Sequence, residues 1–476
     1  MARTINLLQL FCLVFVIAIT GCNKTPGYTP VSTARAVIDE FWLEKTTANA
    51  TLNRPYQGMI IGDTAIHLVV DYGTNITALE PTIFTQADSI TPTGKQNFTN
   101  PVTYTVWAKG KAAVYTVRMV VSAVQFPTVK AMATGSSHIM IVKTDGTVWA
   151  CGNNFLGQLG LGDYSSRNRL TQVPVYDADQ VFSGDAASFI RLKDGTTWGT
   201  GNLYGQLGLG NKNSLASFTR VPHLDDALQF AITYGEVFVL KPDGTVWGAG
   251  RNLTKLLAQG DYDLRASFVK VPVTNVKQVS GNGLDIVVQK NNGELWGWGS
   301  NLAGELGVGD SLPRTVPVLL PSPASNIVKV FAGGNNTFLI DYTGKLWAAG
   351  ANVRGQLGAG DVNRHSSFTR LSFFDTKSIA AVVPHLQTTS FQETNGAVWN
   401  VGDNVYGVMG LGSATTLPFT TPVQLPGFAA RSLGGISNTV FAVKQDGTLW
   451  AWGANTSGAL GGGIDSTIVS SPIQLQ

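Results

Sequence analysis

Short apolar runs separated by glycine-containing turns recur along most of the chain. Runs such as Ile139–Val142 and Val237–Leu240 are each followed by a turn that most often reads Asp-Gly or Asn-Gly, and a second short segment then carries a tryptophan. Apolar runs bounded by turn residues predict β-strands. Asp-Gly and Asn-Gly pairs between two strands predict hairpins with type I′ turns, in which both central residues have positive φ.

The tryptophans of these hairpins recur at a nearly fixed interval. Their spacings are 49, 49, 49, 51, 52 and 51 residues, with a glycine three residues before and three residues after each one: Trp149, Trp198, Trp247, Trp296, Trp347, Trp399 and Trp450. A period near 50 residues indicates an array of one supersecondary unit. Because an exposed indole ring is costly, we expect these tryptophans to pack inside the protein, between neighbouring units.

Each repeat continues with a glycine-rich loop and a proline-aliphatic segment, as in Val173–Val175 and Ser471–Ile473, which makes about four strands per repeat. A stacked solenoid needs atypical polar repeats at its ends, whereas here the first and last repeats keep the motif. We therefore predict a seven-bladed β-propeller over residues 129–476. The sequence does not identify the strand that closes the ring, and Ser471–Leu475 is one candidate.

Residues 34–125 lack the tryptophan period and predict a separate unit. Ile66–Val70, Val102–Trp107 and Tyr115–Val121 are rich in β-branched and aromatic residues and alternate in part, which favours a small β-sandwich. The stretches 72–81 and 98–106 resemble immunoglobulin-like modules of Bacteroidota surface lipoproteins. The expected fold class is thus all-β, a seven-bladed propeller preceded by a small immunoglobulin-like β-sandwich.

The first residues predict export and a lipid anchor. Arg3 precedes an apolar run, Leu7–Ile19, that is short for a membrane span, and residues 1–21 are typical of a signal peptide. Ile19-Thr20-Gly21-Cys22 resembles the bacterial lipobox, so Cys22 is the expected lipidation site and residues 22–33 a tether. The predicted location is the bacterial outer membrane or cell surface; an ordinary signal peptide with an incidental cysteine is the alternative.

Composition and charge narrow the class of partner. Charged residues make up 13% of the chain, glycine accounts for 54 of 476 residues, and the net charge is +3. No basic run is interleaved with aromatic residues, so nucleic-acid binding has no support. Once the leader is removed and Cys22 is lipidated, Cys151 stands alone, and we expect it to be a small apolar strand residue.

The repeat resembles a known family in Asp145–Trp149 followed by Gly152–Asp163, and again in Gly350–Asp361. The pattern, Asp-Gly-Thr-Val-Trp and then Gly-x-Asn-x-x-Gly-Gln-Leu-Gly-x-Gly-Asp, is similar to the regulator of chromosome condensation repeat. That resemblance implies a seven-bladed propeller. The founding member is a guanine nucleotide exchange factor, but we expect no small GTPase partner here, because the repeats lack a long insertion and the chain is predicted to be exported.

The remaining motifs point away from catalysis and from cofactors. The recurrent Asp-x-x-x-Arg, as in Asp163 with Arg167, predicts an ion pair that closes a loop, with a charged ring for an anionic partner as the alternative. The glycine-rich loops lack the Gly-Lys-Ser/Thr of a phosphate cradle. The five histidines have no metal-ligand spacing, and no nucleophile or carboxylate constellation stands out. We therefore expect no metal, no cofactor and no enzyme activity.

The variable part of the glycine-rich loops holds the candidate site. Phe155, Tyr204, Arg354 and Tyr406 occupy roughly equivalent places there, and such side chains on one face of a ring suit a protein or glycan partner. Packing onto the neighbouring blade is the alternative role. The predicted function is a lipid-anchored binding or scaffold protein of the cell envelope. The other hypotheses are a protein inhibitor of an exported enzyme and a glycan-active propeller enzyme.

Overall fold

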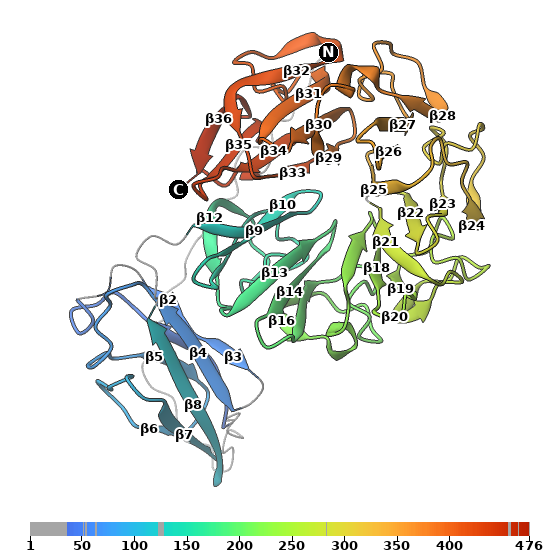
Figure 1. The fold of residues 1–476 in the computed structure, drawn as a ribbon. Coiled ribbons are helices and arrows are strands. Elements are labelled where there is room, and N and C mark those ends of the chain that lie inside the picture. Colours follow the sequence, from blue (N-terminus) through green and yellow to red (C-terminus); the bar gives the residue numbers. More distant parts are fainter. Residues whose placement is uncertain are drawn as a thin grey trace, which may run out of the picture.

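The computed structural model describes residues 36–50, 52, 55–61, 64–121, 128–281, 283–455, 458–464 and 466–475. The predicted signal peptide, Cys22 and the tether lie outside these residues. Apart from two short 3-10 helices, the regular structure of the described residues consists of β-strands, arranged as a small N-terminal module beside a ring of sheets (Figure 1). Within these ranges, no helix has the length and apolar character to cross a bilayer.

Two sheets form the N-terminal module, one with the order β2-β1-β5 and one with the order β3-β4-β8-β7-β6. Their strands are β1 (Ile38–Leu43), β2 (Tyr56–Gln57), β3 (Met59–Ile61), β4 (Ala65–Val70), β5 (Thr82–Thr85), β6 (Ser89–Thr91), β7 (Val102–Ala108) and β8 (Lys111–Val121). All pairs are antiparallel except β4 with β8. The strands expected at 66–70, 102–107 and 115–121 are present within this module.

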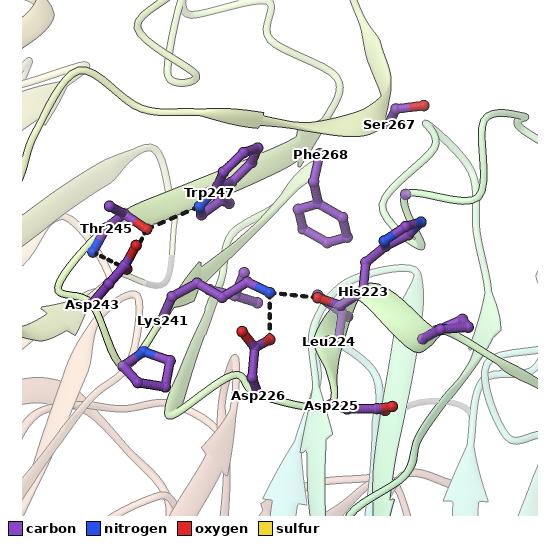
Figure 2. Close-up of a pocket in the computed structure, with 14 residues that line it drawn as sticks. His223, Leu224, Asp225, Asp226, Lys241, Asp243, Thr245, Trp247, Ser267 and Phe268 are labelled. Atoms are coloured by element: carbon purple, nitrogen blue, oxygen red, sulfur yellow. Dashed lines mark hydrogen bonds and ion pairs between the residues drawn. The ribbon is translucent and has the colours of Figure 1, made fainter.

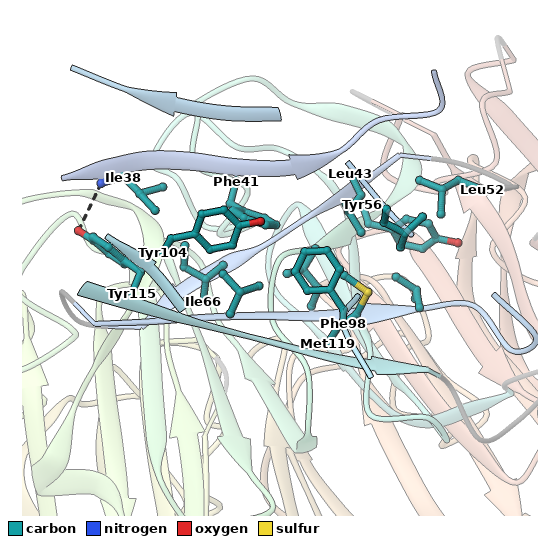
Figure 3. Packing of buried hydrophobic residues seen from close by; sticks show 14 of the residues in the cluster. Ile38, Phe41, Leu43, Leu52, Tyr56, Ile66, Phe98, Tyr104, Tyr115 and Met119 are labelled. Carbon is teal, nitrogen blue, oxygen red and sulfur yellow. Dashed lines mark hydrogen bonds between the residues drawn. The ribbon is translucent and has the colours of Figure 1, made fainter. Parts of the chain in front are cut away.

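The core of this module lies between the two sheets (Figure 3). Side chains of β7 alternate, so that Tyr104 and Val106 are buried while their neighbours face outward, as expected for a strand with one buried face. Phe41 of the smaller sheet meets the ring of Tyr104 edge-on, with centroids 5.7 Å apart. Two sheets closed over one apolar layer make a β-sandwich.

Seven four-stranded sheets follow, each built from four consecutive strands, which we number blades 1 to 7 in chain order. Blades 1 to 3 contain β9 (Val129–Thr134), β10 (His138–Lys143), β11 (Val148–Gly152) and β12 (Arg167–Val173); β13 (Ala178–Ser183), β14 (Ala187–Leu192), β15 (Thr197–Gly201) and β16 (Leu215–Arg220), then the 3-10 helix η1 (Pro222–Leu224); and β17 (Gln229–Ile232), β18 (Glu236–Leu240), β19 (Val246–Gly250) and β20 (Arg265–Lys270).

Blades 4 to 7 repeat the same plan. They contain β21 (Val276–Ser280), β22 (Asp285–Lys290), β23 (Leu295–Gly299) and β24 (Arg314–Leu319); β25 (Ile327–Gly333), β26 (Asn336–Asp341), β27 (Leu346–Gly350) and β28 (His365–Arg370), then η2 (Ser372–Phe374); β29 (Ile379–Pro384), β30 (Thr388–Glu393), β31 (Ala397–Asn404) and β32 (Thr415–Ala429); and β33 (Ser432–Ile436), β34 (Thr439–Val443), β35 (Leu449–Ala454) and β36 (Ile468–Leu475). The predicted all-β fold with a seven-bladed propeller is confirmed.

The ring closes between blades 7 and 1 without a shared strand. The terminal strand β36, a candidate for closure, pairs with β35 of its own blade. Blade 7 meets blade 1 through backbone hydrogen bonds from Leu170 to Gly461 (3.0 Å) and from Gly463 to Asn168 (2.7 Å). The buried Cys151 side chain lies in the apolar cluster between the two blades, as expected for a small apolar strand residue.

The hairpin turns between the second and third strands differ from the expected type I′. In blade 1 the Gly146 amide donates to the carbonyl of Lys143 (2.9 Å), and only Gly146, with φ 83°, is left-handed; Asp145 is not. The Asp145 carboxylate accepts hydrogen bonds from the backbone amide (3.0 Å) and hydroxyl (2.7 Å) of Thr147. These bonds favour a type I turn followed by a left-handed glycine, which is the geometry of a bulged hairpin.

The seven repeated tryptophans lie between blades, but they are only half-buried. Each packs against one of the seven inter-blade apolar clusters. Each indole nitrogen donates to a polar residue of its own hairpin, as Trp247 does to the Thr245 hydroxyl (3.0 Å). The inter-blade role is therefore confirmed, whereas full burial is wrong, because the indole N–H must stay near the turn; Trp298 and Trp452 are the fully buried ones.

The glycine three residues after each tryptophan has a steric reason. These seven glycines end or nearly end the third strand of each blade, all with φ between +82° and +130°. A Cβ added at Gly299 would overlap the carbonyl oxygen of Leu284, in the loop between the first two strands of the same blade, and the other six glycines face the equivalent carbonyl. A side chain here would thus force the two loops of a blade apart.

This close approach predicts that alanine at Gly299 lowers the stability of the protein more than alanine at a glycine with free space around it. Gly299→Ala should lower the free energy of unfolding by about 2–5 kcal/mol, because strain at positive φ adds to a backbone overlap. Gly293→Ala, in the turn of the same blade, is the matched control: it has φ 88° with nothing within 4 Å of an added Cβ. Its cost should be only about 1–2 kcal/mol. Urea denaturation measures both; equal losses would contradict the steric account.

Candidate functional site

The propeller has two chemically different faces. The loop after the first strand and the loop after the third strand of each blade meet on one face, as the backbone hydrogen bonds from Asn153 to Ser137 (2.9 Å) and from Arg251 to Gly235 (3.0 Å) show. We call this the loop face. The opposite face, which we call the turn face, carries the short hairpin turns and the connections between blades.

A buried asparagine holds the long loop after the third strand in every blade. In blade 4 the Asn301 side chain donates to the carbonyl of Asp310 (3.3 Å) and accepts from the amide of Leu306 (3.0 Å). The side-chain amide reaches the carbonyl nine residues ahead in each blade, from Asn154, Asn202, Asn252, Asn301, Asn352, Asn404 and Asn455. An amide side chain can bond both ends of a loop at once, so it fixes the loop backbone.

The residue after this asparagine is an exposed apolar side chain in six consecutive blades. These side chains form what we call the apolar collar: Phe155 (72% exposed), Leu203 (38%), Leu253 (53%), Leu302 (64%), Val353 (68%) and Val405 (37%). The asparagine clamp turns the next residue away from the blade. Repeated exposure of large apolar groups is the feature that distinguishes an interaction surface from ordinary solvent-facing loops.

Further exposed apolar side chains lie in loops of the same face. They include Tyr164, Tyr234, Tyr262, Leu312, Val362, Leu386 and Tyr406, and the exposed Leu417 lies near the start of β32 on the same face. On the turn face the comparable side chains among the described residues are fewer: Leu228, Leu319, Val328 and Tyr342. The apolar surface of the propeller is therefore concentrated on the loop face.

The four predicted site residues all lie on the loop face, but they do not occupy one register. Phe155 belongs to the collar, whereas Tyr204, Arg354 and Tyr406 each stand one position later, two residues after the clamping asparagine. The predicted alignment of these four positions is therefore shifted by one residue. The residues that correspond to Phe155 in the other blades are the aliphatic residues of the collar. Tyr204 is half-buried under the guanidinium of Arg251 from the next blade, 5.1 Å from the ring centroid.

The predicted Asp-x-x-x-Arg ion pairs close the same loops. Arg167 lies 2.5 Å from Asp163, and the equivalent pairs are Arg265 with Asp261 (2.6 Å) and Arg314 with Asp310 (2.8 Å). The hydrogen bond from Arg314 lowers the pKa of Asp310. The pairs are partly exposed, so each contributes little net stability, and their charges are matched within the loop rather than offered to an anionic partner.

A buried pair of acids lies beneath the loop face in blade 4. Asp285 and Glu305 are 7% and 2% exposed, and Asp285 accepts the amide hydrogen of Asn301 (2.9 Å). Burial, and then the hydrogen bond and charge of Glu305, raise the pKa of Asp285 well above its ordinary value. Sequence reasoning missed this pair, although Glu305 stands where Gln158, Gln206 and Gln356 stand in other blades, and that exchange is the signal that locates it.

Family models match segments in both parts of the chain. Residues 292–340 match the model described as the regulator of chromosome condensation (RCC1) repeat, and residues 129–158 and 327–356 match a second model of that repeat. The propeller thus contains segments in blades 1, 4 and 5 that match the RCC1 repeat. Residues 47–119 match a model described as "SGBP, N-terminal", which covers most of the N-terminal sandwich.

Segments of this chain are similar in sequence to known proteins. The chain is 28% identical over 156 residues to the ultraviolet-B receptor UVR8 of Arabidopsis thaliana, which is 32% of this chain and 35% of that protein. It is 35% identical over 86 residues to the X-linked retinitis pigmentosa GTPase regulator of Canis lupus familiaris, which is 18% of this chain and 9% of that protein. The chain thus spans roughly a third of one of these relatives and a tenth of the other.

Solved structures share the fold of the propeller. Prp20p of Saccharomyces cerevisiae has a TM-score of 0.64 at 18% identity, over 71% of this chain and 87% of that one. Human WBSCR16 has a TM-score of 0.56 at 20% identity, over 69% and 89%. At these identities the likeness establishes the propeller fold and nothing about the partners of this chain.

The acid pair Asp285 and Glu305 beneath the loop face predicts that the stability of the protein depends on pH. Because the pKa of Asp285 is raised in the folded state, its contribution to stability is complete below the unfolded pKa of about 3.9 and is lost as pH rises through the folded pKa. Glu305→Gln, which restores the residue of the other blades, leaves Asp285 buried but removes the neighbouring carboxylate, so it should reduce that loss and its stability relative to the native protein should increase from pH 5 to pH 8. Urea midpoints at both values measure it, with Asp285→Asn as a second variant; parallel pH profiles of both variants and the native protein would contradict a raised pKa at Asp285.

Proposed function

We propose that this chain is a lipid-anchored, non-catalytic binding protein of the bacterial cell surface whose propeller contacts a partner protein through the loop face. The main support for this proposal is the apolar collar, in which one loop position exposes an apolar side chain in six consecutive blades. Apolar groups displayed by a rigid scaffold lose little entropy on binding, which suits a stable interface.

The N-terminal module supports a surface location. Its match to the "SGBP, N-terminal" model is consistent with a bacterial surface glycan-binding context, and the same region resembles modules of surface lipoproteins. An exported chain with a lipobox at Cys22 fits that context. The names of the eukaryotic relatives, among them a GTPase regulator, supply no partner for an exported protein.

The chemistry of the collar favours a protein over a glycan on the loop face. Five of the six side chains are Leu or Val, which offer no hydrogen bonds to hydroxyl groups and fit the apolar centre of a protein interface. The acid pair Asp285 and Glu305 is buried beneath the loops, out of reach of a substrate, which supports a binding role over a glycan-active enzyme. Inhibition of an exported enzyme remains the alternative, and a single stoichiometric enzyme partner would favour it.

Negative charge introduced into the apolar collar should weaken capture of the partner. The double substitution Leu253→Glu and Leu302→Glu introduces two carboxylates at the centre of the proposed interface and should weaken binding at least about tenfold. Leu228→Glu on the turn face is the matched control, since Leu228 is 58% exposed and the two collar leucines are 53% and 64% exposed. Quantitative capture of the partner from envelope extract by the soluble ectodomain measures it; equal capture by both variants would place the interface elsewhere.

The anchor has its own test. Cys22→Ser removes the thiol that receives lipid, and a protein held by a lipid anchor should then pass from the membrane fraction to the soluble fraction. Fractionation of cells that express each form measures it. Retention of the Cys22→Ser protein in membranes would contradict a lipid anchor and point to attachment through the folded part.

A further inference from the structure

A cavity of about 890 Å³ lies in the groove between blades 2 and 3, where it reaches from η1 and the hairpin turn of blade 3 to Gly208 in the long loop of blade 2. Its walls come from η1, from the hairpin turn of blade 3 and from the aromatic rings of Trp247 and Phe268 (Figure 2). A cavity of this size with aromatic walls and a few polar groups is typical of a small-ligand site. Nothing in the proposed protein-binding role of the collar uses it.

The ring of Trp247 lines this cavity because the nearby Lys241 contacts other groups and does not cover it. In blades 1, 4 and 7 the lysine six residues before the repeated tryptophan lies over the indole ring, with Lys290 and Lys444 each 3.9 Å from the ring centroid. In blade 3 the equivalent Lys241 instead pairs with Asp226 and donates to the carbonyl of His223 (2.6 Å). Figure 2 shows the Lys241 ammonium turned toward these groups.

The equivalent groove between blades 5 and 6 is filled by its own side chains. There η2 places Phe373 edge-on to Trp399, with centroids 5.3 Å apart, and Lys377 lies 4.9 Å from the same ring. The two blades share their framework, since each has an Arg–Asp pair at this point, Arg220 with Asp225 and Arg370 with Asp375. His223 stands where Phe373 stands, so the same groove is open in one place and closed in the other.

The polar groups around the cavity define the ligand's charge. The carboxylates of Asp225 and Asp226 are each paired with a cation, Arg220 and Lys241. Asp243 accepts hydrogen bonds from the amide (2.9 Å) and hydroxyl (2.6 Å) of Thr245, which leaves its second oxygen as an acceptor. Anions would meet three carboxylates, and a cation would have to compete with Lys241, so a neutral ligand with hydroxyl donors fits best.

We propose that this cavity binds a neutral carbohydrate unit. A pyranose ring has an apolar C–H face, which packs on an electron-rich indole ring, and a rim of hydroxyl groups, which hydrogen-bond to carboxylates. Trp247 and Phe268 supply the aromatic surface, and Asp243 and Asp226 supply acceptors beside it. The site is separate from the collar, so the protein would hold a glycan and a protein partner at the same time.

Two substitutions that copy blade 5 into blade 2 test the site. His223→Phe fills the groove as Phe373 does, and Asp226→Thr, which copies Thr376, frees Lys241 to cover Trp247. Both introduce a residue that this fold already accepts at the equivalent position. The reciprocal Phe373→His is the matched control, because it alters the groove between blades 5 and 6 only.

The measurement is calorimetric titration of the whole ectodomain with cellohexaose, xylohexaose, laminarihexaose, mannohexaose and maltohexaose, with chitosan and polygalacturonate oligomers as charged comparisons. We expect at least one neutral oligomer to bind, with affinity lowered about tenfold or more by His223→Phe and by Asp226→Thr and unchanged by Phe373→His. The collar variant Leu253→Glu/Leu302→Glu should keep this affinity, which separates the site from the loop face. Failure of all neutral oligomers to bind, tighter binding of a charged one, or binding that survives both substitutions would overturn the proposal.

Discussion

The architecture of this protein depends on one close approach inside every blade. A backbone carbonyl of the loop after the first strand occupies the space that a side chain would need at the glycine three residues after each repeated tryptophan. This contact ties two loops of the blade together at one edge. The buried asparagine that follows then bonds to the carbonyl nine residues ahead, so the long loop has one backbone path. The side chain after the asparagine faces solvent, so the backbone explains why this position is exposed in each blade, and the sequence makes it apolar in six of them.

The repeated tryptophans show how one residue can take two roles in a ring of equivalent units. In most blades a lysine or a phenylalanine covers the indole ring, and the residue serves only to join blades. Between blades 2 and 3, Asp226 attracts Lys241 and the ring lines a cavity instead. The change leaves the inter-blade cluster intact, because Trp247 still packs against the buried residues of that interface. A repeat protein can therefore open a groove through one displaced lysine and one histidine in the place of a phenylalanine, with little effect on the framework.

The tryptophan period predicted the number of blades, and the four strands per repeat and the absence of atypical end repeats favoured a closed propeller over a solenoid. The turn type was not predictable from Asp-Gly alone, since it depends on Thr147 bonding back to Asp145. On the loop face, Phe155 was found from its chemistry, but its equivalents were misplaced by one residue because the buried asparagine that sets the register reads as an ordinary polar loop residue. The pairs Asp285 with Glu305 and Lys241 with Asp226 join residues distant in the sequence, and only the folded chain brings them together.

The central claim is that the asparagine clamp fixes the loop face. Hydrogen–deuterium exchange of the native protein and of Asn301→Ala tests it most directly, because the side chain of Asn301 accepts the amide hydrogen of Leu306 (3.0 Å) and donates to the carbonyl of Asp310 (3.3 Å). Loss of the clamp should speed exchange across residues 301–312, while the amides of β26 in the next blade keep their protection. Unchanged exchange in that loop would show that the clamp does not hold it, and the collar would then need another explanation.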